Sequence, residues 1–334
     1  MRLLMRDEAK GREHTIFVTI FSALMVMLAV VVMLMASATA ISGVTLQLDE
    51  NAVDILDKQV ENRAGYIQDQ LRQAQELTDL STYINETAQQ MLDDETLSFK
   101  TLDSGSSDSL PLLLAAAPRM LETLRSKRIS GIFLILNTHD FTGRTSGDRL
   151  PCVYLRDLDP DGPYSDRNDD LSLEFAPAAL VQSTGLYTAS AWQPAFEYQR
   201  EASGFLYLPY QTARTAAPML SADDYGHWTR FPFCLPDDPR SVFSYSQPQI
   251  LSDGTVYGVV GIGLLSDTYL RGKLPTSELQ NNGSGSYLLC STTDDLSADT
   301  LTLQIAVCSS PDTAIHAGNT LVLQKDASGK GFLT

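Results

Sequence analysis

Residues 15–35 form an uninterrupted apolar run, and this run constrains the chain more than any other feature. From Thr15 to Met35 there are 21 residues and no charged side chain. At a rise of about 1.5 Å per residue, a helix of this length spans roughly 30 Å, the thickness of a bilayer's hydrocarbon core. The run therefore predicts a transmembrane helix at 15–35, and no later apolar run is long enough to span a second time.

The charges around this run predict its orientation. Four basic residues precede it within residues 1–14, whereas the next basic residue after it is Lys58. The positive-inside rule places residues 1–14 in the cytoplasm and the bulk of the chain outside, as a single-pass protein of the cell membrane. The small residues at 36–40 could suit a signal peptidase, so a cleaved signal peptide remains an alternative to an uncleaved anchor. The apolar run exceeds the usual length of about 7–15 residues for such a peptide, which favours an uncleaved anchor.

Composition narrows the function classes. The 334 residues carry a net charge of −17, which argues against nucleic acid as a partner because phosphate binding needs a basic surface. A hydrophobic fraction of 43% is too high for a disordered chain and too low for a polytopic membrane protein. Four cysteines and four histidines, with no paired metal-ligand spacing and no G-x-S-x-G elbow, indicate neither a metal cofactor nor an enzyme.

Residues 36–97 are predicted to form a stalk after the anchor. From Val53 to Met91 the apolar positions recur in steps of three and four, which is typical of one stripe along a helix of about 40 residues. Such a stripe suits pairing with a second copy, so we expect a homodimer through the stalk, although burial along its own domain would give the same pattern. The stripe consists of Val53, Leu56, Val60, Ala64, Ile67, Leu71, Ala74, Leu77, Leu80, Ile84, Ala88 and Met91.

The remaining residues predict an α+β domain. A helix is expected over 110–126, with Pro118 as a kink or restart, followed by a buried strand over 129–136. Ser252-Asp253-Gly254 is a turn at hairpin spacing between two strands. The helices followed by an antiparallel meander indicate a sheet flanked by helices. The later strands are expected at 204–210, 241–247, 255–265, 286–291 and 300–308.

At this point the chain resembles a known family. A long helix after a single anchor leads to Ser244-Tyr245-Ser246-Gln247-Pro248, then Asp253-Gly254, then the glycine-rich strand 256–264. With the segments 155–160 and 224–228, this pattern resembles the double Cache sensor domain of bacterial transmembrane receptors over roughly residues 40–290. The resemblance implies PAS-like antiparallel sheets on the stalk helix. It assigns 98–270 to a membrane-distal ligand-sensing subdomain and 271–334 to a partial membrane-proximal one whose sheet is truncated.

The resemblance also implies a function. The distal sheet of this family usually holds a small molecule, and ligand binding moves the stalk helix and signals to a histidine kinase, diguanylate cyclase or chemoreceptor output module. No such module is recognised in the sequence. The alternative that remains open is a membrane-anchored structural or assembly ectodomain without a small-molecule ligand.

Aromatic residues gather between positions 192 and 245, in the region predicted to hold the ligand. Small-molecule pockets are lined by such rings with a few polar groups, and an arginine can grip a carboxylate. Ordinary core packing is the competing interpretation. The predicted ligand-binding residues are Trp192, Tyr198, Tyr210, Trp228, Arg230 and Tyr245.

Three further features carry smaller predictions. Amino-acid-binding members of the family carry an acid at the position occupied here by Gly263, so the resemblance argues against an amino-acid ligand.

Asp157, Asp159 and Asp161 match the front half of a calcium loop, but position twelve is Asn168, and an acidic surface turn explains the run equally simply. Cys290 and Cys308 fall on neighbouring predicted strands and could form a disulfide; the alternative is that all four cysteines, with Cys152 and Cys234, are buried thiols.

Overall fold

The structure is a computed structural model. It describes residues 25–33, 35, 51–100, 102, 106–162, 168–200, 202–215, 222–235, 238–275, 286–309, 318–325 and 331–333. Residues 1–66 and 67–334 form two separate units. Within the described residues, no helix is long and apolar enough to cross a membrane. The predicted anchor at 15–35 lies largely outside the described residues, which include only 25–33 and 35 of it, all helical.

The predicted stalk helix is present but interrupted. One helix covers residues 51–75, and α2 follows at Thr78–Asp93, so the prediction of one continuous helix was wrong at residues 76–77. Leu77 turns into the core there and is 1% exposed. The interruption frees carbonyl groups at the end of the first helix, and the ammonium of Lys127 donates to the carbonyl of Gln73 at 2.7 Å.

The apolar stripe is buried in its second half. Ile84 and Ala88 are fully buried in α2, whereas Val53, Leu56 and Val60 are about half exposed. Packing around α2 involves α3 (Ser106–Lys127) and the strand β9 (Ser241–Ile250). The helix α3 continues through Pro118, so the predicted kink or restart does not end the helix.

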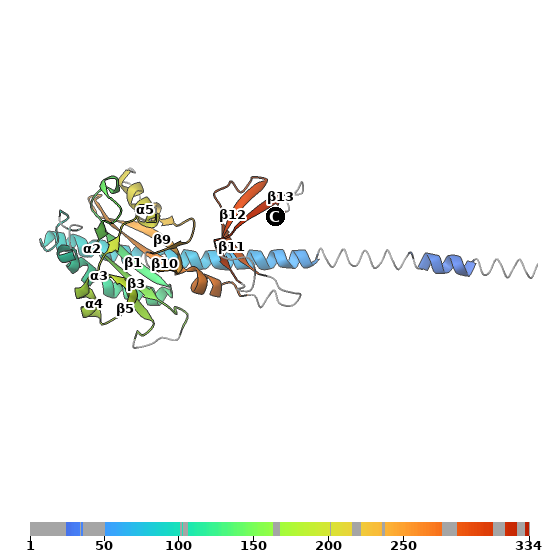
Figure 1. The fold of residues 1–334 in the computed structure, drawn as a ribbon, viewed down its shortest axis with the longest axis horizontal. Coiled ribbons are helices and arrows are strands. Elements are labelled where there is room, and N and C mark those ends of the chain that lie inside the picture. The colour runs from blue at the N-terminus through green and yellow to red at the C-terminus, as the bar shows by residue number, and fades with distance from the viewer. Residues whose placement is uncertain are drawn as a thin grey trace, which may run out of the picture. The chain divides into compact units, whose positions relative to one another are not determined.

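The main sheet contains eight strands among the described residues, in the order β5-β4-β3-β1-β10-β9-β7, with β8 pairing β9 (Figure 1). Its pairs are antiparallel except β4–β5, which is parallel, so the sheet is mixed rather than purely antiparallel as predicted. The strands are β1 (Gly131–Leu136), β3 (Cys152–Asp157), β4 (Leu171–Phe175), β5 (Tyr187–Gln193), β7 (His227–Trp228), β8 (Phe233–Cys234), β9 and β10 (Val256–Leu265).

The two faces of this sheet have different cores. Because side chains alternate along a strand, Ile132 and Leu134 of β1 join the core with α2 and α3, while Phe133 and Ile135 join a second core on the opposite face. The second core is covered by α5 (Gly204–Thr215) and by short elements. These are η1 (Phe141–Gly143) and β2 (Arg149–Leu150) paired with β6 (Phe196–Glu197). The helix α4 (Ala178–Thr184) packs on α3, and η2 (Ala222–Tyr225) packs on β9 and α5.

The segment 204–210 was predicted as a strand and is instead the start of α5. Its buried residues, Phe205, Leu206, Pro209 and Tyr210, are spaced as on one face of a helix. Pro209 cannot donate to the carbonyl of Phe205 one turn earlier, and the Ser246 hydroxyl of β9 donates to that carbonyl instead. A contact with the sheet thus stabilises a helix that contains a proline.

A smaller antiparallel sheet lies near the C-terminus; the predicted strands 286–291 and 300–308 correspond to its first two strands, and its last two were not predicted. Its order among the described residues is β11-β12-β13-β14, and Ala306 and Val307 of β12 join the same core as α2. It is preceded by a short π-helix, η3, at Ser266–Leu270. The strands are β11 (Leu288–Ser291), β12 (Thr300–Cys308), β13 (Thr320–Lys325) and β14 (Gly331–Leu333).

Because one half of the stripe is buried and the other is exposed, shortening a side chain should destabilise the protein more in the buried half. Ile84→Ala should lower the free energy of unfolding by about 2–5 kcal/mol, because it opens a cavity in the core. Val60→Ala, on the same stripe but 53% exposed, should change it by less than about 0.5 kcal/mol. Urea denaturation of both variants makes the comparison, and equal losses would contradict this description of the stripe.

Candidate functional site

The face of the main sheet opposite α2 carries a large cluster of aromatic side chains. The ring of Phe205 on α5 stacks on Phe233 at 4.9 Å and meets Phe133 edge-on at 5.3 Å between ring centroids. A cavity beside these rings, lined by Phe196, Ser203 and their neighbours, measures about 10 Å³, close to the space of one water molecule. This aromatic face is therefore packed as a core.

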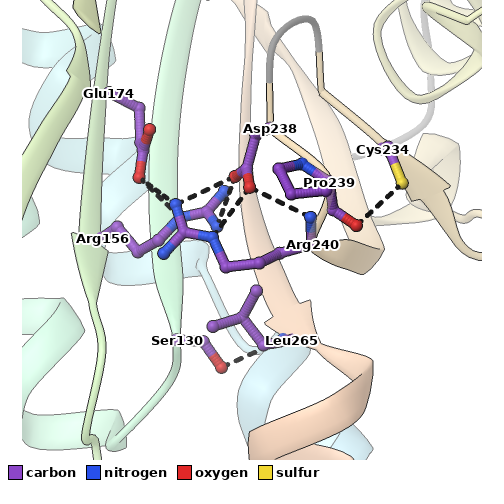
Figure 2. A network of polar contacts seen from close by, with 8 residues as sticks. All are labelled: Ser130, Arg156, Glu174, Cys234, Asp238, Pro239, Arg240 and Leu265. Carbon is purple, nitrogen blue, oxygen red and sulfur yellow. Dashed lines mark hydrogen bonds and ion pairs between the residues drawn. The ribbon is translucent and has the colours of Figure 1, made fainter. Parts of the chain in front are cut away.

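A buried cluster of four charged side chains lies on the same face (Figure 2). Arg156 of β3 is fully buried, and its guanidinium lies 3.1 Å from Glu174 on β4 and 2.8 Å from Asp238. Arg240 contacts the same two carboxylates at 3.0 and 2.8 Å and is 40% exposed. We call Arg156, Glu174, Asp238 and Arg240 the charged cluster; its formal charges balance, as a buried set of ions requires.

The local sequence places these charges. Arg156 shares a face of β3 with Cys152 and Tyr154, two residues apart along the strand. A β-bulge where β3 pairs with β4 leaves Glu174 unpaired between Leu173 and Phe175, next to Tyr154 and Leu155. The bulge reorients the carboxylate so that it reaches Arg156.

Bonding within the charged cluster is uneven. Arg240 donates hydrogen bonds to both carboxylates. Burial acts to raise the pKa of Asp238, but the hydrogen bonds that Asp238 accepts from Arg240 and the charges of Arg156 and Arg240 together hold that pKa below its usual value. None of the three guanidinium nitrogens of Arg156 has a hydrogen-bond partner of good geometry within the described residues. A groove of about 420 Å³ between β4, β5 and residues 238–240 reaches Glu174, Asp238 and Arg240.

Two glycines make room for Tyr154 beside the cluster. Gly131 of β1 and Gly263 of β10 pair directly, and the ring of Tyr154 lies across them. A Cβ on Gly131 would lie 2.8 Å from that ring, and one on Gly263 would overlap the Tyr154 hydroxyl. The guanidinium carbon of Arg156 lies 5.4 Å from the ring centre, and burial raises the pKa of the Tyr154 phenol. The tyrosine thus occupies the space where a side chain at position 263 would lie.

The six predicted ligand residues do not come together. Tyr198 and Tyr210 lie in the aromatic core, where each ring contacts Phe141. Trp228 and Tyr245 pack on each other on the α2 side, and Trp228 donates to Gln75 at 2.8 Å. Trp192 packs on the α2 side from β5, and Arg230 is exposed.

The calcium-loop carboxylates have cationic neighbours. Asp157 lies 3.5 Å from Arg125, and Asp161 lies 2.8 Å from Lys273. Burial, more than any other effect, raises the pKa of Asp157 to about 6. Within the described residues there is no group of three metal-ligating side chains.

None of the four cysteines, all of which lie in the described part of the chain, forms a disulfide. Cys290 and Cys308 do lie on the paired strands β11 and β12, but they are diagonal, because Cys308 faces Leu288 and Cys290 faces Ile305. Burial raises the pKa of the Cys290 thiol, and Cys308 adds to this. Cys234 is exposed, so the alternative of buried thiols does not hold for it.

The charged cluster was missed in the sequence. Its members come from three segments, and Asp238 lies 82 positions after Arg156, so no spacing rule connects them. One signal was present: an arginine at an inward position of the otherwise apolar run 152–156 indicates a buried charge that needs a partner.

Comparisons with known proteins give structural likeness only. No family model and no curated protein sequence matches the chain. It is similar to the periplasmic sensory domain of the Campylobacter jejuni chemoreceptor Tlp1, with 12% identity and a TM-score of 0.38 over 78% of this chain and 72% of that one. Methyl-accepting chemotaxis protein X gives 17% identity and a TM-score of 0.32 over 70% of each chain.

A third similar structure is the extracellular domain of mmHK1S-Z2, a protein assigned as a histidine kinase. Its identity is 12% and its TM-score 0.27, over 76% of this chain and 92% of that one. By their titles, the first and third of these structures are a periplasmic and an extracellular domain. At these identities and TM-scores, the likeness decides nothing about a ligand or about signalling.

The packing of Tyr154 over Gly263 gives a test of the local geometry. Gly263→Ala should lower the free energy of unfolding by about 1–3 kcal/mol, because the new methyl group displaces the phenol. In a Tyr154→Phe background, Gly263→Ala should lower the free energy of unfolding by clearly less, because the hydroxyl that the new methyl group would overlap is absent. Denaturation of the four proteins in this double-mutant cycle measures the difference, and equal costs in both backgrounds would refute the contact.

The charged cluster predicts a large effect of removing its buried cation. Arg156→Met should lower the free energy of unfolding by about 3–5 kcal/mol, because it leaves buried carboxylates without their inner partner. Arg119→Met, which removes an exposed pair with Glu122, should cost less than about 1 kcal/mol and serves as the control. A loss below about 1 kcal/mol for Arg156→Met, measured by urea denaturation, would show that the cluster is not an energetic unit.

Proposed function

We propose that the chain is the extracytoplasmic small-molecule-sensing module of a bacterial transmembrane signal-transduction receptor. One observation carries this proposal: a single sheet holds an incompletely bonded charged cluster on one face and is hydrogen-bonded to the helices on the other. A ligand that binds beside the charged cluster and shifts its strands would shift the same strands to which the helices are bonded. The two faces are only one strand layer apart, so no long path is needed between them.

Polar contacts between the helices and the sheet support this coupling. Each one joins a side chain of the helical segment 75–85 to a different strand. Because these contacts lie around a buried apolar stripe, a shift of the strands changes their geometry directly. The pairs are Gln75 with Trp228 at 2.8 Å, Ser81 with Gln249 at 3.0 Å, and Asn85 with Tyr257 at 2.7 Å.

The proposed topology and assembly follow from the N-terminal part. Residues 15–35 anchor the chain in the membrane with the N-terminus in the cytoplasm, and the sheet domain lies outside. The exposed apolar residues Val53, Leu56 and Val60 continue the stripe of the helix and suit a homodimer through the stalk. In this arrangement ligand binding in the distal domain moves the stalk and thereby an output module of kinase, cyclase or chemoreceptor type.

The proposed ligand site is the groove beside the charged cluster, at the margin of the packed aromatic face. Arg240 is the accessible member of the cluster and opens on the groove between β4 and β5. Of the residues predicted from sequence, Tyr198 and Tyr210 lie on this face and remain in the proposal. Gly263 supports a ligand other than an amino acid, because no acid stands there to pair with an ammonium group.

A structural ectodomain remains the second candidate. It is favoured by the packing of the aromatic face, where the cavity beside Phe205 and Phe233 measures only about 10 Å³. A module used only for assembly would fill this face with side chains in that way.

A metabolite panel separates the two candidates. At least one compound of a panel of organic acids, amines and nucleobases should raise the melting temperature of the protein and of the Arg119→Met control, but not that of Arg240→Met. The twenty common amino acids should have no effect. Differential scanning fluorimetry makes the measurement. A panel without any response would favour the structural ectodomain, and a shift of several degrees with an amino acid would overturn the inference from Gly263.

A further inference from the structure

A large cavity lies at the end of the sheet next to the hairpin between β9 and β10, and it is distinct from the groove beside the charged cluster. It measures about 810 Å³ and is bounded by α2, the end of α5, η2 and the hairpin between β9 and β10. Neither the charged cluster nor any of the six ligand residues predicted from sequence lines it. Its size falls in the range of small-molecule sites, roughly 300–1,000 Å³.

The wall of this cavity contains a buried amide without a partner. Gln247 of β9 pairs with Val260 across the sheet and is fully buried. Both its Oε1 and its Nε2 lack a hydrogen-bond partner within the described residues. Buried polar side chains almost always have one, because leaving them unpaired is costly. The cavity is therefore where a partner for this amide belongs.

Neighbouring side chains add further hydrogen-bonding groups. Asn85 on α2 accepts the hydroxyl of Tyr257 on its Oδ1, so its amide NH₂ is the group it can offer to the cavity. Ser81 accepts from Gln249 at 3.0 Å and keeps a hydroxyl hydrogen to donate. Together with Gln247, these residues present both donors and acceptors along one wall.

The charged residues of the wall already have partners. Arg214 donates to the Tyr210 hydroxyl at 3.3 Å and to a backbone carbonyl at 3.4 Å. Asp223 accepts from the Thr78 hydroxyl at 2.8 Å, and Asp253 accepts from a backbone N–H of its own turn at 2.8 Å. These partners are neutral groups, and the wall carries charges of both signs, so the uncharged amide of Gln247 remains the wall group that most needs a ligand.

The wall also has an apolar part, so the cavity is not uniformly polar. The side chains of Tyr225, Leu251 and Val256 line it beside the amides and hydroxyls. A neutral sugar combines hydroxyl groups with C–H faces and so matches both parts. An apolar ligand would leave the Gln247 amide unpaired.

We propose that this cavity binds a neutral polyhydroxylated molecule of mono- or disaccharide size, with the amide of Gln247 as its central hydrogen-bonding contact. An amide places a donor and an acceptor side by side, which suits two adjacent hydroxyl groups. The proposal goes beyond the proposed function, because it concerns a different cavity and holds whether or not the chain signals.

Calorimetric titration of the full chain with glucose, galactose, maltose and trehalose tests the proposal. At least one sugar should bind wild-type protein, and Gln247→Leu should lose at least about tenfold in affinity. The variant should melt no lower than wild type, because it removes an unpaired amide. Gln211→Leu is the matched control, since the Gln211 Oε1 on α5 is also buried without a partner but lies outside the cavity lining.

Two further variants keep the test decisive. Thr82→Trp, at an exposed position of the wall, should abolish binding by filling the cavity even if Gln247→Leu fails to fold. Arg240→Met should leave sugar binding unchanged, which separates this site from the charged cluster. Absence of binding by all of these sugars would mean that the cavity holds only water and would overturn the proposal, as would unchanged affinity in Gln247→Leu or Thr82→Trp.

Discussion

The contact between α2 and the main sheet is the interaction on which the rest of the domain depends. Leu77, Leu80, Ile84 and Ala88 bury one stripe of the helix against the inner residues of the strands. At roughly 1.5–3 kcal/mol for each large apolar side chain buried, this stripe fixes the helix more firmly than any of the polar contacts around it. Those polar contacts set the register, so the helix and the sheet behave as one body. A change in the strands therefore cannot leave the helix unaffected.

The opposite face of the sheet is arranged by steric constraints and charge. The Gly131–Gly263 pair lets Tyr154 lie flat on the strands, and the bulge at Glu174 brings a carboxylate to Arg156. The inner arginine is held by ion pairs without well-aligned hydrogen bonds, while the outer one is well bonded. Arg240 is therefore the exposed, well-bonded arginine of the cluster, and Arg156 is the buried one held by its two ion pairs.

The sequence predicted the parts of the fold that depend on local pattern. The strands β1 and β10 are runs of β-branched and apolar residues, and Gly254 takes the positive φ that the turn 252–254 requires. The edge strand β5 was not predicted, because its sequence, YTASAWQ, is largely polar and its hydrogen bonds come from a parallel neighbour. The segment 204–210 is ambiguous in sequence, since an alternating apolar run also fits one helix face.

Other features depend on contacts that no local pattern encodes. The helix interruption at 76–77 has neither a proline nor a glycine, and it follows from the burial of Leu77 and the bond from Lys127. The charged cluster and the cavity beside Gln247 are each built from segments far apart in the chain. The aromatic residues were a correct sign of a core, but alternation along the strands divides them between two faces.

The central claim is that the sheet domain lies outside the cytoplasm on a single membrane anchor. Cys234 is exposed, whereas Cys152 and Cys308 are buried, so a Cys290→Ser variant leaves one accessible thiol. A membrane-impermeant maleimide should label this variant in intact spheroplasts that produce the full chain, and a Cys234→Ser/Cys290→Ser protein should stay unlabelled. Labelling only after the membrane is permeabilised would contradict the account.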